Sequence, residues 1–253
     1  MSAALPDPAS RAAPLAAGAA AVGRAFRALT ILGGNRPAAQ IDASAMYYPL
    51  VGLAVGALWV ATDRLVTAAA GRTSASVAVV LVAALVSRAR PLLALGRLLA
   101  ALPSGAARRL TVLESGRGGL VSVSVAAVAA VEVLVLCALD RFRLVGLLFA
   151  PVLASCSIVV LAVGSRAARA DGRRLKFAPD VTFREFGIAT TATFALVFLT
   201  AEFLGLLLVL ATAVLTVAAR VFFHRWIDGV NETAVLAAAE AIQILILALL
   251  VIL

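Results

Sequence analysis

Seven long apolar windows constrain this chain more than any other feature of its sequence. They lie near residues 45–62, 75–87, 120–139, 144–164, 186–201, 203–219 and 233–253. An α-helix rises 1.5 Å per residue, so about 20 apolar residues cross the roughly 30 Å hydrocarbon core of a bilayer. Apolar residues make up 63% of the sequence, well above the roughly 45–50% of a soluble domain. We therefore predict a polytopic membrane protein.

The windows also predict the fold class. They are rich in Ala, Val and Leu and lack the alternation of lipid-facing barrel strands. The predicted fold is all-α, with about six or seven transmembrane helices; six result if the two windows around Glu202 form one bent, hairpin-like unit. Residues 1–20 are rich in Ala and Pro and are expected to be a disordered tail before a single transmembrane domain over residues 21–253. Residues 21–32 are expected to form an interfacial helix.

The positive charge is distributed unevenly along the chain. The net charge is +9, and 18 of the 22 Lys and Arg residues lie in segments 1–44, 88–119, 165–185 and 220–232. The positive-inside rule assigns such segments to the cytoplasm. We therefore expect a multi-pass protein of the bacterial inner membrane with a cytoplasmic N-terminus. The lipid bilayer explains the basic charge, so we expect no nucleic-acid partner.

Short motifs containing Gly, Pro and charged residues follow one another in a defined order. Arg36 and Pro37 precede a first apolar window that contains Pro49, Gly52 and Gly56. Three later motifs are 113–119 (LESGRGG), 166–172 (RAARADG) and 225–233 (RWIDGVNET), the last followed by Glu240. Together, over roughly residues 24–250, these motifs resemble the cobalamin-5'-phosphate synthase (adenosylcobinamide-GDP ribazoletransferase) family.

The resemblance implies an activity and a set of substrate contacts. Members of that family transfer a phosphoryl-linked cobinamide from a GDP-activated substrate to the hydroxyl of α-ribazole, with Mg²⁺ as cofactor. The matched motifs imply substrate-binding roles for four residues: Arg117, Arg169, Asp171 and Glu240. On this interpretation, the chain binds a corrinoid or nucleotide ligand.

One stretch departs from the family pattern. The family's acidic, metal-binding run corresponds to residues 86–98, where Arg88 replaces a His and three Asp positions are occupied by Arg90, Ala94 and Arg97. No Asp or Glu lies between Asp63 and Glu114, so a small change of register cannot restore the acids. Closely spaced carboxylates hold the Mg²⁺ that neutralises charge during pyrophosphate cleavage. The chain is therefore predicted to be a divergent member without the acidic motif, and no metal ligand is assigned.

The remaining charged residues allow two interpretations. Glu114, Asp228 and Glu232 are the candidate catalytic acids, and Asp228 with Glu232 has the spacing of one helical turn, which could hold a metal. Alternatively, Asp228 caps the last helix and Glu232 stabilises its first turn. A further set, Arg88, Arg90 and Arg97, could bind a phosphate-bearing nucleotide or lipid headgroup, or could anchor the chain at the membrane surface.

Two acids lie within predicted spans. Charged side chains inside a bilayer are costly and mark function by default. Glu132 lies near the middle of its window and Glu240 about two turns into the last one. Each is either functional or engaged in a hydrogen bond between packed helices. Glu202 lies at a predicted turn outside the membrane, where exposure removes that argument.

Three functions remain open from the sequence. The first is an active, Mg²⁺-dependent ribazoletransferase. The second is a catalytically inactive or repurposed paralogue that keeps the membrane scaffold and forms homo-oligomers or pairs with an active copy. The third is an unrelated small-molecule transporter, although the chain has no internal repeat of the kind that transporters show.

Overall fold

The computed structural model describes residues 8–31, 43–116, 118–170, 173–174 and 181–253. The helices are α1 (Pro8–Leu29), the 3₁₀ helix η2 (Ala43–Tyr47), α2 (Tyr48–Val86), α3 (Arg90–Ala101), α4 (Ala106–Ser115), α5 (Gly119–Ala138), α6 (Arg143–Ala162), α7 (Phe183–Trp226) and α8 (Glu232–Ile252). An antiparallel ribbon of two-residue strands, β1 (Arg169–Ala170) and β2 (Arg173–Arg174), follows α6. The prediction of an all-α fold is confirmed.

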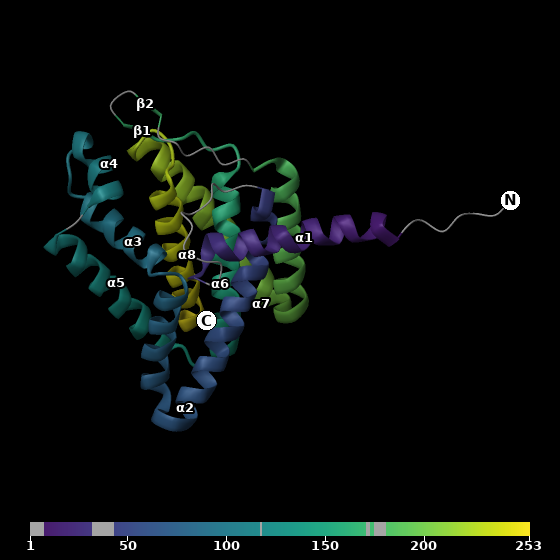
Figure 1. The fold of residues 1–253 in the computed structure, drawn as a ribbon. Helices are drawn as coiled ribbons and strands as arrows, with labels where there is room; N and C mark the ends of the chain where they lie inside the picture. The colour runs from purple at the N-terminus through teal and green to yellow at the C-terminus, as the bar shows by residue number, and fades with distance from the viewer. Residues whose placement is uncertain (1–7, 32–42, 117, 171–172, 175–180) are drawn as a thin grey trace.

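Two of the long helical elements are hairpins. Of the described residues, five helical stretches are long and apolar enough to cross a membrane. However, α2 contains a non-helical residue at Gly71 (φ 81°, ψ 172°) and α7 contains one at Glu202 (φ 48°, ψ −126°). Figure 1 shows the two arms of α2 meeting at a tip. If each arm of α2 and α7 is counted separately, these four arms together with α5, α6 and α8 match the seven apolar windows. Glu202 is exposed at its turn, as expected.

The centre of the bundle is formed by α6 and α8. Within their most apolar stretches, 72% of α6 and 56% of α8 is buried, against 17–28% for the other spans. Figure 1 shows the two helices surrounded by α2, α5 and α7, and α6 packs on α2, α7 and α8. The outer helices therefore present most of their apolar surface to lipid.

The glycines of the first span permit the closest of these contacts. Gly52 and Gly56 are one turn apart and share a face of α2. A Cβ atom at Gly52 would lie 2.5 Å from the carbonyl oxygen of Pro151, and one at Gly56 would overlap the carbonyl of Leu148. The backbones of α2 and α6 approach too closely for a side chain, so this spacing acts as a helix-packing motif.

The N-terminal helix has a different direction. Figure 1 shows α1 running across the bundle rather than along it, an orientation suited to an interfacial helix. It begins at Pro8 and so includes part of the segment expected to be a tail. The division of the chain at residue 20 remains a prediction, and residues 1–7 lie outside the described part.

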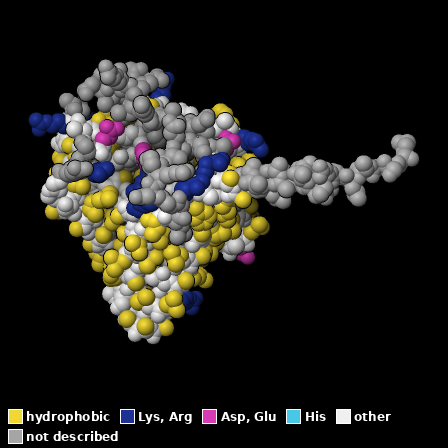
Figure 2. Space-filling view, in the orientation of Figure 1, with side chains coloured by type: hydrophobic (Ala, Val, Ile, Leu, Met, Phe, Trp, Pro, Cys, Tyr) yellow, Lys and Arg dark blue, Asp and Glu magenta, His cyan; other side chains and the backbone are white. Residues whose placement is uncertain are grey.

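Figure 2 shows that most Lys and Arg side chains on this face of the molecule lie above a broad apolar belt. We call this end, which carries Arg90 and Arg97, the basic end.

At the opposite end a buried ion pair joins α2 to α6. Arg143 begins α6, and its Nη2 donates to Oδ1 of Asp63 at 2.5 Å and to the hydroxyl of Ser76 at 3.0 Å. The two charged side chains are only 11% and 10% exposed. Asp63 and Ser76 lie on different arms of α2, so one guanidinium fixes both arms against α6. Arg143 lies outside the four segments that hold most of the basic residues, and its charge is used for this contact.

This ion pair generates a stability prediction. Replacing Asp63 by Ala should lower the free energy of unfolding by about 3–5 kcal/mol, because it leaves the buried Arg143 charge without its partner. Asp140, which pairs with Arg72 but has an 85% exposed side chain, provides the matched control. Its replacement by Ala should cost less than about 1 kcal/mol. Reversible unfolding in detergent micelles would measure both, and equal effects would contradict the role of burial.

Candidate functional site

The arginine-bearing segment forms a tight turn followed by a helix. Arg88 and Ala89 adopt consecutive left-handed conformations, with φ of 57° and 53°. They reverse the chain after α2, and α3 begins at once with Pro91 in its first turn, where its missing N–H costs nothing. The helix packs against α5 and α8. This packing places the arginine segment beside the motif at residues 225–233.

Arg90 connects three elements at the basic end. Its Nη1 donates to the carbonyl oxygen of Ala28 in α1 at 2.9 Å. Its Nη2 forms an ion pair with Oε1 of Glu232, the first residue of α8. The side chains of Arg90 and Glu232 are 30% and 54% exposed, so the pair lies at the surface of the bundle. The positive charge of Arg90 is thus balanced by an acid from the last motif.

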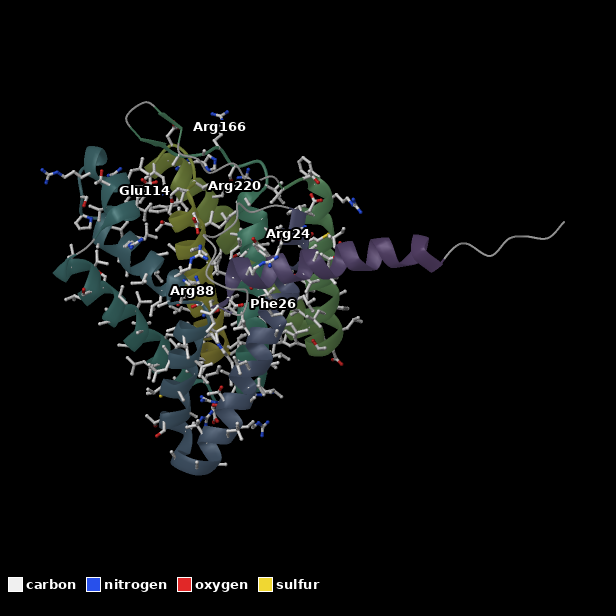
Figure 3. The ribbon with its side chains drawn as sticks, in the orientation of Figure 1. Arg24, Phe26, Arg88, Glu114, Arg166 and Arg220 are labelled. Atoms are coloured by element: carbon white, nitrogen blue, oxygen red, sulfur yellow. The ribbon has the colours of Figure 1, made fainter. Side chains whose placement is uncertain are left out.

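Arg97 lies two turns farther along α3, on the same side as Arg90. Its Nη1 donates to the carbonyl oxygen of Glu114 at 3.4 Å. Its Nε is buried and has no hydrogen-bond partner among the described residues. Figure 3 shows Arg24 and Arg88 near the crossing of α1, and Glu114 nearer the end that carries α4. Two guanidinium groups, those of Arg90 and Arg97, therefore lie between α1, α4 and α8.

The last motif is organised by a residue that the sequence analysis did not single out. Asn231 is the N-cap of α8: its side chain accepts a hydrogen bond from the backbone N–H of Ala234 at 2.8 Å. Its Nδ2 also donates to Oε1 of Glu114 at 3.4 Å. Asn231 therefore links the 113–119 motif to the 225–233 motif. Its capping residue type, just before an apolar window, was a signal that could have identified it.

The expectation that Asp228 caps α8 is wrong. Asp228 has a left-handed φ of 54° and is followed by Gly229 with φ 149°. An N-cap needs extended backbone next to the first helical turn, and Asn231 provides it with φ −127° and ψ 174°. Asp228 lies in the preceding turn, so it does not share a helix face with Glu232. Glu232 does occupy the first turn, as expected.

The residues of this region do not fit a carboxylate-bound Mg²⁺ site. Across the described residues, no group of three or more His, Cys, Asp or Glu side chains could hold a metal ion. In α3, Arg90 and Arg97 carry positive charge and the buried Ala94 is apolar. Glu232 is already paired with Arg90. The geometry therefore gives the ion no set of oxygen ligands on α3.

The loop after α6 reaches the same end of the bundle. The backbone N–H of Ala168 donates to the carbonyl of Val230 at 2.9 Å, and that of Val230 donates to the carbonyl of Arg166 at 2.8 Å. The 166–172 and 225–233 motifs are thus joined directly. The backbone of Arg169 pairs with Arg174 in the ribbon. Asp171 and Arg117 lie outside the described residues.

The two intramembrane acids lie deeper and close to one another in the fold. Gln243 of α8 donates through Nε2 to Oε1 of Glu132 of α5 at 3.1 Å. Both residues and Glu240 are no more than 8% exposed. All three line a cavity of about 100 Å³ whose lining also includes Arg90. Gln243 was missed from the sequence, although a polar residue three positions after Glu240 in an apolar span was a signal.

The motifs that converge at the basic end are those on which the family resemblance depends. The family model described as cobalamin-5-phosphate synthase matches residues 21–251. The chain belongs to this family. Its membership excludes the alternative of an unrelated transporter.

Two relatives of the cobalamin-5-phosphate synthase family illustrate the similarity. An adenosylcobinamide-GDP ribazoletransferase of Geotalea daltonii is 30% identical over 217 residues, which cover 84% of this chain and 87% of the relative. One of Syntrophobacter fumaroxidans is 27% identical over 213 residues, covering 82% and 86%. No solved structure gives a significant match.

The contact between Arg90 and Glu232 can be tested by a double-mutant cycle. Arg90→Ala and Glu232→Ala should destabilise the protein by less in combination than their separate effects predict. Because both side chains are partly exposed, the coupling should be about 0.2–1 kcal/mol, measured by unfolding in detergent. The coupling should decrease at high salt because solvent ions screen the pair. Strict additivity would show that the two residues do not interact.

Proposed function

We propose that this protein takes part in cobalamin biosynthesis as a substrate-binding member of its family that performs little or no transfer by itself. Its ligand is the adenosylcobinamide-GDP named for its relatives, held at the phosphates by arginine rather than by a carboxylate-bound Mg²⁺. The observation that carries this proposal is the position of Arg90 and Arg97 on one side of α3, next to the start of α8. The transferase reaction itself requires an active family member in the same cell.

The chemistry of arginine supports a phosphate ligand. A guanidinium group presents N–H donors in a planar fork that matches two phosphate oxygens and keeps its charge at all physiological pH values. The buried Nε of Arg97 has no partner among the described residues. A phosphate would compete with Glu232 for Arg90, whose side chain is 30% exposed and therefore reachable. Arg88 is exposed at the adjoining turn and adds positive charge.

The location of the site supports the proposed membrane orientation. The segments with most of the basic residues meet at the basic end, which we propose faces the cytoplasm of a bacterium. The N-terminal helix crosses the bundle near this end (Figure 1). A charged nucleotide ligand could then reach Arg90 from water without crossing the bilayer.

A limited catalytic capacity follows from the charges in α3. Each 1.36 kcal/mol lost from transition-state stabilisation slows a reaction tenfold, and preorganised charge is often the largest contribution to that stabilisation. Arginines can neutralise the phosphates of a bound substrate. However, Arg90 and Arg97 offer no oxygen ligands for the ion that the resemblance implies, and Glu232 is paired with Arg90.

A second candidate is a working adenosylcobinamide-GDP ribazoletransferase. The observation that favours it is the linkage between Glu114 and Asn231, next to the Arg90–Glu232 pair. This linkage keeps two acids at the convergence of three family motifs. In that case Glu114 and Glu232 are the candidate catalytic groups, with Arg90 and Arg97 as the phosphate-binding groups.

Binding without a metal tests the main proposal. Adenosylcobinamide-GDP should bind the purified protein in the presence of EDTA, as measured by isothermal titration calorimetry. Combined replacement of Arg90 and Arg97 by Ala should weaken binding at least tenfold, because a charge-assisted hydrogen bond contributes about 1.5–3 kcal/mol. The matched control is Arg64→Ala with Arg141→Ala, at the opposite end. Loss of binding in EDTA, or unchanged affinity of the α3 variant, would contradict the proposal.

Complementation separates the two candidate functions. A bacterial strain that lacks its synthase, supplied with cobinamide and dimethylbenzimidazole, should not grow when it expresses this protein, because α3 lacks the acidic motif. Membrane fractions must contain the folded protein at the level of a complementing family member. Growth under these conditions would favour the active transferase, and would then have to depend on Glu114 or Glu232.

A further inference from the structure

A cavity between the spans extends inward from Arg90, one of the arginines proposed to bind the phosphates. It has a volume of about 100 Å³ and is lined by α1, α2, α3, α5, α6 and α8. Its lining is mostly apolar, including Val51, Val55 and Ile158. Five residues with polar groups line its interior: Trp59, Glu132, Ser155, Glu240 and Gln243; the Ser155 hydroxyl already donates to the carbonyl of Pro151. Arg90 and Ser87 line it toward the basic end.

The polar groups of this cavity are not all satisfied by one another. Trp59 is 2% exposed, and its indole N–H has no hydrogen-bond partner in the part of the chain that the structure describes. Glu132 receives one bond from Gln243. Within the same described part, Glu240 is 8% exposed and no hydrogen bond to its carboxyl group is present. The cavity therefore offers an unused donor on α2 and unused acceptors on α5 and α8.

Such groups are costly to bury in apolar surroundings. A buried donor or acceptor without a partner costs roughly 1–3 kcal/mol, and an acid inside a membrane span costs at least as much. Helices α2 and α5 each contribute one of these groups, Trp59 and Glu132, and α8 contributes Glu240 and Gln243. This convergence is the arrangement expected of a binding subsite, in which a few polar groups fix a ligand within apolar walls.

The size and polarity of the space select the ligand group. A pocket for a complete drug-sized ligand has roughly 300–1,000 Å³, so a cavity of about 100 Å³ accepts one side group of a larger molecule. The group must accept a bond from the Trp59 N–H and donate to a glutamate oxygen. An ammonium group donates but cannot accept, and a tertiary amide accepts but cannot donate. A hydroxyl group and a primary carboxamide do both, and only the carboxamide places its acceptor and its donors on two different atoms, which suits partners on different helices.

We propose that the intramembrane cavity is a subsite for a primary carboxamide group that enters from the basic end. Its carbonyl oxygen accepts from the indole N–H of Trp59, and its NH₂ group donates to the carboxyl group of Glu240. Gln243 holds Glu132 in place beside them. This subsite adjoins Arg90 of the proposed phosphate site and adds a polar requirement to the apolar part of a ligand.

The fluorescence of Trp59 provides the test. The chain contains two Trp residues, so the Trp226→Phe variant leaves Trp59 as the only reporter. Butyramide should change its emission in a saturable way, with a Kd of about 1–10 mM, a range reasonable for a ligand of six heavy atoms. Two compounds of similar size, N,N-dimethylacetamide and n-butylammonium, should bind at least tenfold more weakly. Equal response to all three would overturn the proposal, as would no saturable response to butyramide.

Substitutions in the cavity sharpen the test. In the Trp226→Phe background, Glu240→Met removes the acceptor at nearly constant volume and should weaken butyramide binding at least tenfold. Glu202→Met, at the exposed turn of α7, is the matched control and should bind as before. If Glu240→Met does not fold, Ala83→Leu fills the cavity from its apolar wall and should abolish the response. Retained binding in a folded Glu240→Met or Ala83→Leu variant would refute the assignment.

Discussion

The close approach of α2 to α6 is the contact on which the rest of the molecule depends. In a bilayer, lipid tails are as apolar as leucine, so helices associate through close packing and internal polar bonds rather than through exclusion of water. Gly52 and Gly56 allow the two backbones to meet, and Arg143 ties both arms of α2 to the start of α6. With α6 fixed, α8 occupies the remaining central position and brings Asn231 and Glu232 to the basic end.

The arginines of α3 are tied into the surrounding arrangement of helices. Arg90 makes bonds to α1 and α8, so its guanidinium group joins three elements of the bundle. Its positive charge balances the adjacent carboxylate of Glu232. What this end of the bundle can hold therefore depends on these side chains more than on the helical scaffold that carries them.

The sequence was sufficient for features that depend on local composition. The long apolar windows and the turn at Glu202 both follow from residues close together in the chain. Contacts between distant residues could not be predicted in the same way. Glu132 and Gln243 are separated by 111 positions, and nothing local identifies which helices pack together. The cap of α8 was assigned to the wrong residue because Asp228 and Asn231 are both capping types, and only backbone conformation distinguishes them.

The two hairpins also affect how the chain enters the membrane. Because the arms of α2 join directly at Gly71 and those of α7 at Glu202, each pair crosses with almost no connecting loop. Both arms can therefore enter the bilayer together. Each arm makes its backbone hydrogen bonds within its own helix and presents apolar side chains to the lipid. Very little polar chain has to be carried to the far side at either turn. The polar connecting segments, including the 113–119 and 225–233 motifs, consequently gather at the basic end of the protein.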